Sequence, residues 1–265
     1  MIHLRSLRLT THPSDEYPFN VPAVLASRTL AFTASVTFFV GENGSGKSTL
    51  LESLAVKCRL PTVGSDDVAT DATLRHARRL ADSMKLSWEH RAQRGFFLRA
   101  EDFFGFTRRL AIERAGFKER LAEIEKEYED RSDYAKQLAM GPVRGSLDAL
   151  QRSYGEDLDA HSHGESFLKL FQARFAPDGL YLLDEPEAPL SPTSQLALLS
   201  MLQEMVGRGG QFIIATHSPI LLAFPGAVIW SFDEQPPRAV PYDELEHVRV
   251  TRDFLASPER YLRHL

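Results

Sequence analysis

A glycine-rich turn at residues 41–48 has the residue types that bind phosphate. The segment Gly41-Glu-Asn-Gly-Ser-Gly46-Lys47-Ser48 fits the pattern G-x-x-x-x-G-K-[ST] and follows an apolar, β-branched run at 36–40. Glycines let several backbone N–H groups point at phosphate oxygens, and the start of the next helix adds a positive field. Lys47 would reach the β- and γ-phosphates, and Ser48 would bind Mg²⁺. The turn therefore predicts binding of a nucleoside triphosphate.

A second apolar run ends in two carboxylates. Leu180-Tyr-Leu-Leu183 is followed by Asp184, Glu185 and Pro186, which fits a buried strand that ends at a proline turn. In P-loop enzymes a carboxylate at such a strand end holds Mg²⁺, a role that suits Asp184. Glu185 would lie beside the γ-phosphate and orient or deprotonate the attacking water. Surface acids at an ordinary strand exit are the weaker interpretation beside a complete phosphate loop.

Two more segments place polar residues where α/β proteins bind ligands. The strand predicted at 212–215 is followed by Thr216-His217-Ser218, so this imidazole would lie at the carboxyl edge of a parallel sheet. Upstream, His161-Ser-His-Gly-Glu-Ser166 precedes an amphipathic helix, and a serine and a glycine there expose a hydroxyl and backbone N–H groups to an anion. Taken alone, the first would be a structural histidine and the second a helix cap. The four segments together favour a nucleotide site.

Their order and spacing resemble the ATP-binding-cassette (ABC) ATPases, and most closely the small stand-alone bacterial ATPases related to the structural-maintenance-of-chromosomes and recombination-repair branch. The signature of that family commonly reads Leu-Ser-Gly-Gly-Gln or ends in Glu, whereas His161 and His163 replace the leucine and the first glycine here. Residues 184–186 are similar to the family's Walker B motif, and residues 187–191 to its dimer-contacting D-loop. Glu101 stands near the Q-loop position, where glutamine is usual.

The resemblance implies an ATPase that uses ATP and Mg²⁺ and forms an ATP-dependent homodimer, packed head to tail and loosened by hydrolysis. It implies Glu185 as the catalytic base and His217 as the γ-phosphate sensor. The metal ligands it implies are Ser48 and Asp184, with Glu101 as a further candidate. The implied nucleotide-binding residues are those of the phosphate loop and, across the dimer, those of the signature: Gly41, Asn43, Gly44, Ser45, Gly46, Lys47, Ser48 and Thr49, then Ser162, Gly164 and Glu165.

The elements that position these residues predict an α/β fold. Strand and helix alternate in the last third, which implies parallel strands joined by crossovers. Three short runs at 4–9, 19–25 and 30–33 predict a small N-terminal antiparallel sheet, interrupted by prolines. The resemblance to the ABC fold then implies one ATPase domain over 1–265. Its nucleotide-binding core would comprise residues 1–102 and 176–265, and residues 103–175 would form an inserted helical lobe that carries the signature.

The helical lobe and the segment before it leave alternatives open. Phe117, Leu121, Ile124 and Tyr128 form an apolar seam, which favours a solvated helix packed on its own domain and leaves a short coiled coil or partner-binding hairpin as the alternative. A seam of two heptads excludes a long coiled-coil arm. Residues 75–109 hold nine Lys or Arg against four acids. With Trp88, Phe96 and Phe97 nearby they could meet nucleic acid, although a solvated helix face with core aromatics is the simpler interpretation.

Composition and charge set the class of protein. The chain of 265 residues holds 43% hydrophobic and 25% charged residues, close to the average of globular proteins. One cysteine excludes an internal disulfide framework, and no apolar run is long enough to span a bilayer. The N-terminus lacks the apolar stretch of a signal peptide, so a cytoplasmic protein is expected. The net charge of −5 argues against a basic coat for nucleic acid, although a local patch remains compatible with it.

The biological role stays open between several classes. A switch in DNA repair or defence, or in the regulation of a protein partner, is the main interpretation, and the energy-coupling subunit of a membrane transporter is the alternative. For the adenine ring, Tyr17 and Phe19 are the candidate stacking residues.

Overall fold

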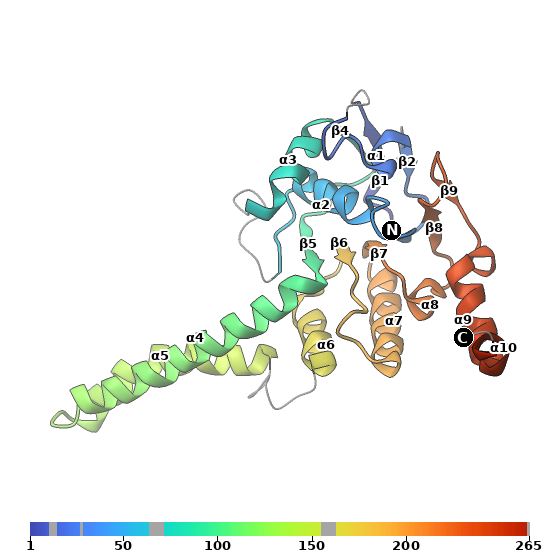
Figure 1. The fold of residues 1–265 in the computed structure, drawn as a ribbon. Coiled ribbons are helices and arrows are strands. Elements are labelled where there is room, and N and C mark those ends of the chain that lie inside the picture. The colour runs from blue at the N-terminus through green and yellow to red at the C-terminus, as the bar shows by residue number, and fades with distance from the viewer. Residues whose placement is uncertain (11–14, 27–28, 64–71, 155–162, 264–265) are drawn as a thin grey trace.

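A six-stranded sheet forms the centre of the fold (Figure 1). The computed structural model describes residues 1–10, 15–26, 29–63, 72–154 and 163–263. The strand order is β5-β6-β7-β3-β8-β9. The first five strands in this order are parallel to one another, and β9 is antiparallel to β8. The predicted mixed α/β fold with a mostly parallel core is thus confirmed. The strands are β3 Val36–Val40, β5 Arg94–Arg99, β6 Gly179–Asp184, β7 Gln211–Ala215, β8 Val228–Ser231 and β9 Arg238–Ala239.

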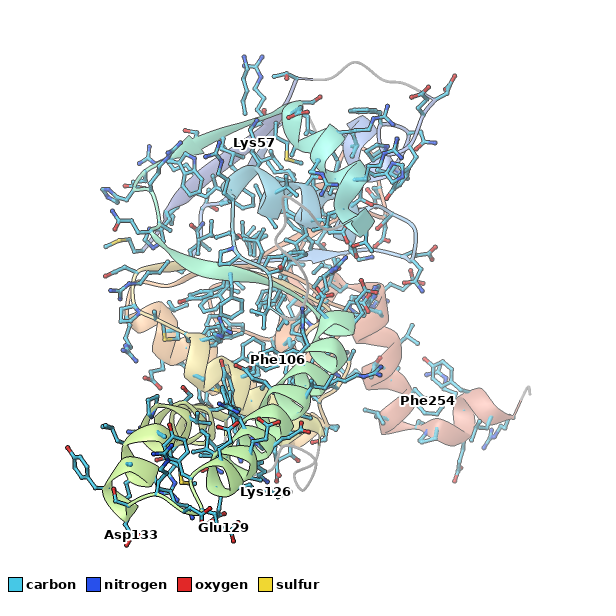
Figure 2. The ribbon with its side chains drawn as sticks, turned by 90° about the vertical axis from the view of Figure 1, so that its left-hand side faces the viewer. Lys57, Phe106, Lys126, Glu129, Asp133 and Phe254 are labelled. Atoms are coloured by element: carbon cyan, nitrogen blue, oxygen red, sulfur yellow. The ribbon has the colours of Figure 1, made fainter. Side chains whose placement is uncertain are left out.

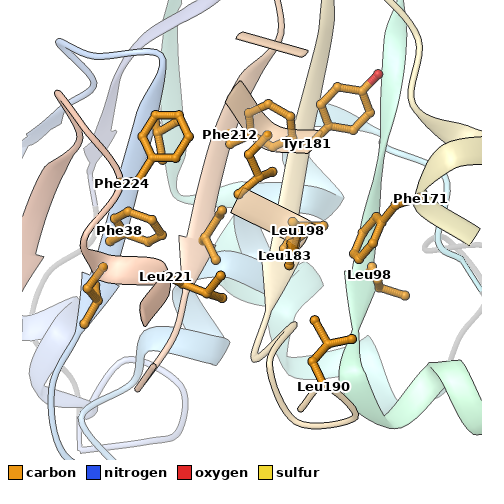
Figure 3. Packing of buried hydrophobic residues seen from close by; sticks show 14 of the residues in the cluster. Phe38, Leu98, Phe171, Tyr181, Leu183, Leu190, Leu198, Phe212, Leu221 and Phe224 are labelled. Carbon is orange, nitrogen blue, oxygen red and sulfur yellow. The ribbon is translucent and has the colours of Figure 1, made fainter. Parts of the chain in front are cut away.

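Helices cover both faces of this sheet, which explains why its strands are apolar throughout. Along β6, Leu180 and Leu182 join the apolar cluster beneath α2, whereas Tyr181 and Leu183 join the cluster on the opposite face. Figure 3 shows the second cluster, where Tyr181 and neighbouring side chains interlock between the sheet and its helices. The covering helices are α2 Lys47–Cys58 and α3 Arg75–Asp82 on one side, and α6 His163–Arg174, α7 Pro192–Gly207 and α8 Pro219–Leu222 on the other.

The predicted N-terminal antiparallel sheet is present, but its membership differs from the prediction. Strand β1 Leu4–Leu9 pairs with β2 Thr29–Ala31 and with β4 Met84–Trp88. The strand expected at 19–25 is wrong, because that segment contains a turn and the short helix α1 Pro22–Ala26. Proline is favoured at the first position of a helix, where its missing N–H has no partner to lose. The third strand comes instead from 84–88, where the alternation of Met84, Leu86 and Trp88 was overlooked.

Two long helices form a hairpin that projects from the body of the molecule (Figure 1). They are α4 Ala100–Glu127 and α5 Asp133–Tyr154. At 1.5 Å per residue α4 is about 42 Å long. The seam continues beyond the predicted one through Phe103, Phe106 and Leu110, all buried, so the helix is longer than the two-heptad seam suggested. The expectation of a helix packed on its own domain is wrong, because α4 packs along α5 in a hairpin, and partner binding by this hairpin stays a prediction. Figure 2 shows the hairpin running outward from Phe106 to its tip between Lys126 and Asp133.

The C-terminal part returns to the sheet. Helix α9 Glu246–Ala256 follows a short turn at Tyr242–Glu244 and precedes α10 Pro258–Leu262. Leu245 and Val248 anchor α9 to the cluster that contains α7 and α8. None of the described helices combines the length and apolar character that a membrane crossing requires.

Candidate nucleotide-binding site

The carboxyl ends of five parallel strands bring the candidate residues to one edge of the sheet. Gly41 follows β3, Asp184 ends β6, His217 follows β7 and Asp233 follows β8. In the parallel register Arg99 of β5 is opposite Asp184, and Asp184 is opposite Ala215. Ligands bind at this edge in open α/β sheets. The structure thus brings together residues that are up to 192 positions apart in the sequence.

The loop between β3 and α2 has the conformation that its glycines were expected to provide. Gly44 and Gly46 have φ angles of 84° and 96°, in the region that favours glycine. A Cβ atom at Gly46 would lie 3.0 Å from Val21, so the loop also packs too closely for a larger residue. Ser45 is buried within the loop, whereas Asn43 is exposed at its outer side. These features make a tight loop that leads directly into α2.

Lys47 is 5% exposed and lies folded against this loop. Its Nζ donates hydrogen bonds to the carbonyl oxygens of Gly41 and Glu42, at 2.5 and 2.9 Å. Burial lowers the pKa of the Lys47 ammonium from its ordinary value, while Glu185, Asp184 and Asp233 oppose the shift. The ammonium therefore already lies among carboxylates at the edge of the sheet, in the place where phosphate charge would stabilise it.

Ser48 and Asp184, the two predicted Mg²⁺ ligands, are hydrogen-bonded to each other. The hydroxyl of Ser48 donates to Oδ1 of Asp184 at 3.1 Å, across 136 positions of sequence. Asp184 is only 8% exposed, and burial raises the pKa of its carboxyl to about 7, against the hydrogen bond from Ser48. A hydroxyl and a carboxylate supply the oxygen ligands that Mg²⁺ takes alongside phosphates. The pair fits that ion, whose charge would offset the cost of ionising Asp184.

Glu185 has an unusual backbone. Its φ angle is 49°, in the left-handed region that non-glycine residues rarely adopt, and its N–H donates to the carbonyl of Ala215 at 2.9 Å. The side chain is exposed at the edge of the sheet, directly after Asp184. Backbone strain of this kind clusters at functional sites because the surroundings must hold it in place. The turn directs Glu185 outward at the position where the sequence predicts the base.

His217 is held through its backbone by the segment after Glu185. Its N–H donates to Oε1 of Glu187 at 2.7 Å, and burial raises the pKa of the Glu187 carboxyl against the hydrogen bonds from Thr216 and His217. The Nε2 atom of His217 is buried without a hydrogen-bond partner among the described residues. Such atoms are rare in proteins and mark places where a ligand or water completes the bonding.

The signature segment is described in part. Ser162 and His161 lie outside the described residues. Gly164 is buried at the start of α6, where a Cβ atom would lie 3.3 Å from the carbonyl oxygen of Pro189 and 3.4 Å from Oγ of Ser194. Glu165 is exposed on the first turn of α6. The signature helix therefore packs closely against the predicted D-loop of its own chain.

The adenine candidates lie beside α2. The Tyr17 hydroxyl and the Thr49 hydroxyl are 3.1 Å apart, and the Tyr17 side chain is 44% exposed. Phe19 lies under the guanidinium of Arg79, 5.6 Å from its ring centroid. Tyr17 thus lies next to the predicted nucleotide-binding Thr49 with an open surface, whereas Phe19 already has a cation on its face.

Sequence reasoning missed a charged cluster behind the site. Arg99 donates to both carboxylate oxygens of Asp102, at 2.8 and 2.9 Å, and lies 3.6 Å from Glu52 on α2. Burial raises the pKa of the Glu52 carboxyl to about 7, opposed by Arg99. The predicted metal ligand Glu101 pairs with Arg99 at 3.3 Å and its side chain is 73% exposed. Within the described part of the chain its contacts do not join it to Ser48 or Asp184, so its role as a ligand stays a prediction.

The aromatic part of the nucleic-acid hypothesis is wrong. Phe96 and Phe97 are 4% and 0% exposed, on opposite faces of β5, and they pack in the two apolar clusters. Arg99 is likewise engaged with acids. Trp88 is partly buried against the cluster beneath α2. The core-aromatic interpretation is confirmed for Phe96 and Phe97, because helices cover both faces of the sheet and β5 presents its alternate side chains to them.

Residues 72–223 match the protein family described as "AAA domain, putative AbiEii toxin, Type IV TA system". The match covers more than half of the chain and includes the predicted Walker B, D-loop and switch-histidine segments. The chain belongs to this family. With the phosphate loop described above, the predicted class, an ABC-type P-loop ATPase, is confirmed.

Two curated proteins are similar to this member of the family. A "Putative ABC transporter ATP-binding protein" of Methanosarcina acetivorans is 31% identical over 67% of this chain and 61% of its own length. A "Putative ribose/galactose/methyl galactoside import ATP-binding protein 3" of Agrobacterium fabrum is 27% identical over 74% of this chain and 37% of its own length. The chain therefore spans less than two thirds of the length of either relative.

Among solved structures, the head domain of SMC from Thermotoga maritima resembles the chain at 14% identity. The likeness covers 91% of this chain and 99% of that chain, with a TM-score of 0.43. At this TM-score the comparison adds nothing to the sheet order described above.

Proposed function

We propose that this protein binds MgATP at the carboxyl edge of its sheet and hydrolyses it. The observation that carries the proposal is the 3.1 Å hydrogen bond between Ser48 and Asp184. This bond joins the phosphate loop to the end of β6 and presents two oxygen ligands beside the Lys47 ammonium. When bound, Mg²⁺ would neutralise charge on the β- and γ-phosphates.

The remaining residues at the edge supply the other roles. Lys47 would exchange its contacts with loop carbonyl oxygens for phosphate oxygens. Glu185, exposed and next to Asp184, would take a proton from the attacking water, and His217 would donate from its unpartnered Nε2 to the γ-phosphate. The backbone N–H groups of the phosphate loop would hold the other phosphate oxygens, and Tyr17 beside Thr49 would stack on adenine.

We further propose that two copies sandwich two ATP molecules. In each chain the signature helix α6 packs against α7 and α5, on the face of the sheet opposite α2 (Figure 1). Gly164 lies against Pro189 rather than at its own phosphate loop. Ser162, Gly164 and Glu165 would then complete the site of a second copy, with residues 103–175 acting as the helical lobe of one ATPase domain. Because ATP favours the closed pair by its added contacts, hydrolysis would loosen it.

For the biological role, a soluble cytoplasmic switch that acts on DNA or on a protein partner is the main proposal. The names of the two curated relatives favour a second candidate, the energy-coupling subunit of a membrane transporter. Salt-sensitive binding of duplex DNA that changes with ATP would support the first role, because phosphate contacts weaken as salt rises. Absence of such binding would remove nucleic acid as the partner.

The direct test of ATPase activity is release of inorganic phosphate by the purified chain. The proposal predicts release from ATP that needs Mg²⁺ and stops when the ion is chelated. ATP binding without any release at saturating Mg²⁺ would contradict hydrolysis while leaving the binding site intact.

A further inference from the structure

A pocket of about 760 Å³ opens on the outer side of the phosphate loop. Its wall includes Gly41 to Ser45, His217 after β7, and Asp233 after β8. Its other wall comes from the C-terminal helix α9, through Glu246, His247 and Val250. A helix some 200 positions after the phosphate loop thus closes one side of the site.

His247 enters this pocket with an unused hydrogen-bonding atom. Its Nε2 is buried and has no hydrogen-bond partner among the described residues, which is also true of Nε2 in His217. Two unpartnered imidazole nitrogens at one pocket are costly unless something supplies acceptors for them. A neutral imidazole with its proton on Nε2 donates one hydrogen bond from that atom, so in this tautomer an incoming oxygen-rich group would satisfy both rings.

The charges around His247 indicate that this group is an anion. Burial lowers the pKa of His247, and the neighbouring charges of His217 and Lys47 lower it further, while Asp233 opposes the shift. His247 therefore lies within electrostatic reach of Lys47 and His217. The single acid in that set is already engaged, because Asp233 accepts from the Glu42 N–H at 2.7 Å and from the Ser231 hydroxyl at 3.0 Å. Two further acids, Glu42 and Glu246, line the pocket with exposed side chains. Two imidazoles therefore face one pocket beside the phosphate loop, with the Lys47 ammonium within electrostatic reach of His247.

We propose that His247 is a second histidine that binds the terminal phosphate of the nucleotide, acting with His217 to distinguish a triphosphate from a diphosphate. This inference rests on the proposed function and names a residue of that same site. A diphosphate would lack the phosphate that reaches the pocket, so His247 would contribute to binding of ATP and not of ADP. Because His247 is on α9, the contact also links the C-terminal helix to the state of the nucleotide.

The test is the ratio of ADP to ATP dissociation constants, measured with the full chain and a non-hydrolysable ATP analogue in place of ATP. His247→Ala should weaken binding of the analogue by about tenfold or more, as loss of a hydrogen bond to a charged group does, and leave ADP binding unchanged. His247→Gln keeps an N–H donor and should recover part of the preference. Arg249→Ala, an exposed neighbour on the same helix, is the matched control and should keep the wild-type ratio.

The outcomes separate this inference from the proposed function. If the wild-type chain prefers the analogue and His247→Ala prefers it equally, the role of His247 is refuted while the nucleotide site stands. If the wild-type chain binds neither nucleotide, the proposed function itself fails. An equal loss of ADP and analogue binding in His247→Ala, with circular dichroism unchanged, would also overturn the proposal, because His247 would then support the loop rather than the terminal phosphate.

Discussion

The edge of the parallel sheet and the projecting hairpin differ in which side chains they bury and which they expose. At the sheet edge, polar groups are buried: Lys47 is 5% and Asp184 8% exposed. On the hairpin formed by α4 and α5, apolar groups are exposed: Ile112 is 63% and Tyr134 77% exposed. Buried charge is costly and informative, whereas single exposed apolar residues are common on protein surfaces.

The comparison indicates in which region the chain accepts a loss of folding stability in exchange for function. The buried charges at the edge lie within electrostatic reach of one another, and a phosphate and its Mg²⁺ would compensate them further. The apolar residues on the hairpin are scattered along two helices whose shared seam is already filled by Leu110, Ile124 and Met140, each at most 5% exposed. Substitutions at the edge should therefore change nucleotide chemistry, whereas those on the outer faces of the hairpin should not.

The largest expected effect is at the edge. Lys47→Ala should weaken ATP binding by roughly a thousandfold, about 4 kcal/mol, because the phosphates lose their buried cation. Lys118→Ala removes the same side chain from an exposed site on α4 and should leave binding unchanged. Isothermal titration calorimetry compares the ATP affinities of the two variants. Tight binding retained by Lys47→Ala would count against the phosphate-loop assignment.

The next effect separates the inner and outer faces of the hairpin itself. Ile124→Ala leaves a cavity in the seam at a residue 4% exposed, and should destabilise the hairpin by about 2–4 kcal/mol. Ile112→Ala, the same change twelve residues earlier on the outer face, should stay within about 0.5 kcal/mol. Amide hydrogen exchange along α4 and α5 measures the loss of stability in both variants. Equal effects of the two substitutions would mean that something covers Ile112.

A smaller effect comes from Glu52 behind the site. Its pKa is about 7 in the folded chain, against an ordinary value of 4.5, so between these pH values the folded chain keeps a proton that the unfolded chain loses. The unfolded chain then binds fewer protons, and the free energy of unfolding falls as pH rises from 4.5 to 7. Glu52→Gln should remove roughly 1–3 kcal/mol of that decline.

Urea unfolding at pH 5 and pH 8 measures the decline. Glu119→Gln on the exposed side of the hairpin is the control and should keep the wild-type dependence on pH. A Glu52→Gln variant with an unaltered dependence would show that this carboxyl is not held protonated in the folded chain.

The sequence predicted the edge better than the hairpin for a physical reason. Backbone geometry at the edge is dictated locally, by glycines, by strand ends and by a proline, and these signals can be read without knowing the fold. The meeting of Ser48 with Asp184 followed from the rule that parallel strands end at one edge. The length of the hairpin could not be read in this way, because a charged residue, Arg114, stands at the seam position between Leu110 and Phe117.

The residues that were missed depend on contacts between distant segments. Glu52 and Arg99 look like ordinary helix and strand residues until α2 and β5 are packed together. His247 becomes notable only when α9 closes the pocket beside His217. Asp233 could have been predicted from the sequence, since it follows a strand next to β3. The rule that parallel strands end at one edge of the sheet would have placed it at the site. The prediction of a strand at 19–25 failed because a proline at the start of a helix was interpreted as a strand interruption.

The central claim, that a second copy completes the site once ATP is bound, is tested most directly by the molar mass of Glu185→Gln with MgATP. Multi-angle light scattering should give about twice the 29.8 kDa of the single chain with ATP and the single-chain mass with ADP. Glutamine keeps the shape of the side chain but cannot take the proton, so the ATP-bound pair should accumulate. A Glu185→Gln chain that binds ATP and remains a monomer, or that hydrolyses it at the wild-type rate, would contradict the account.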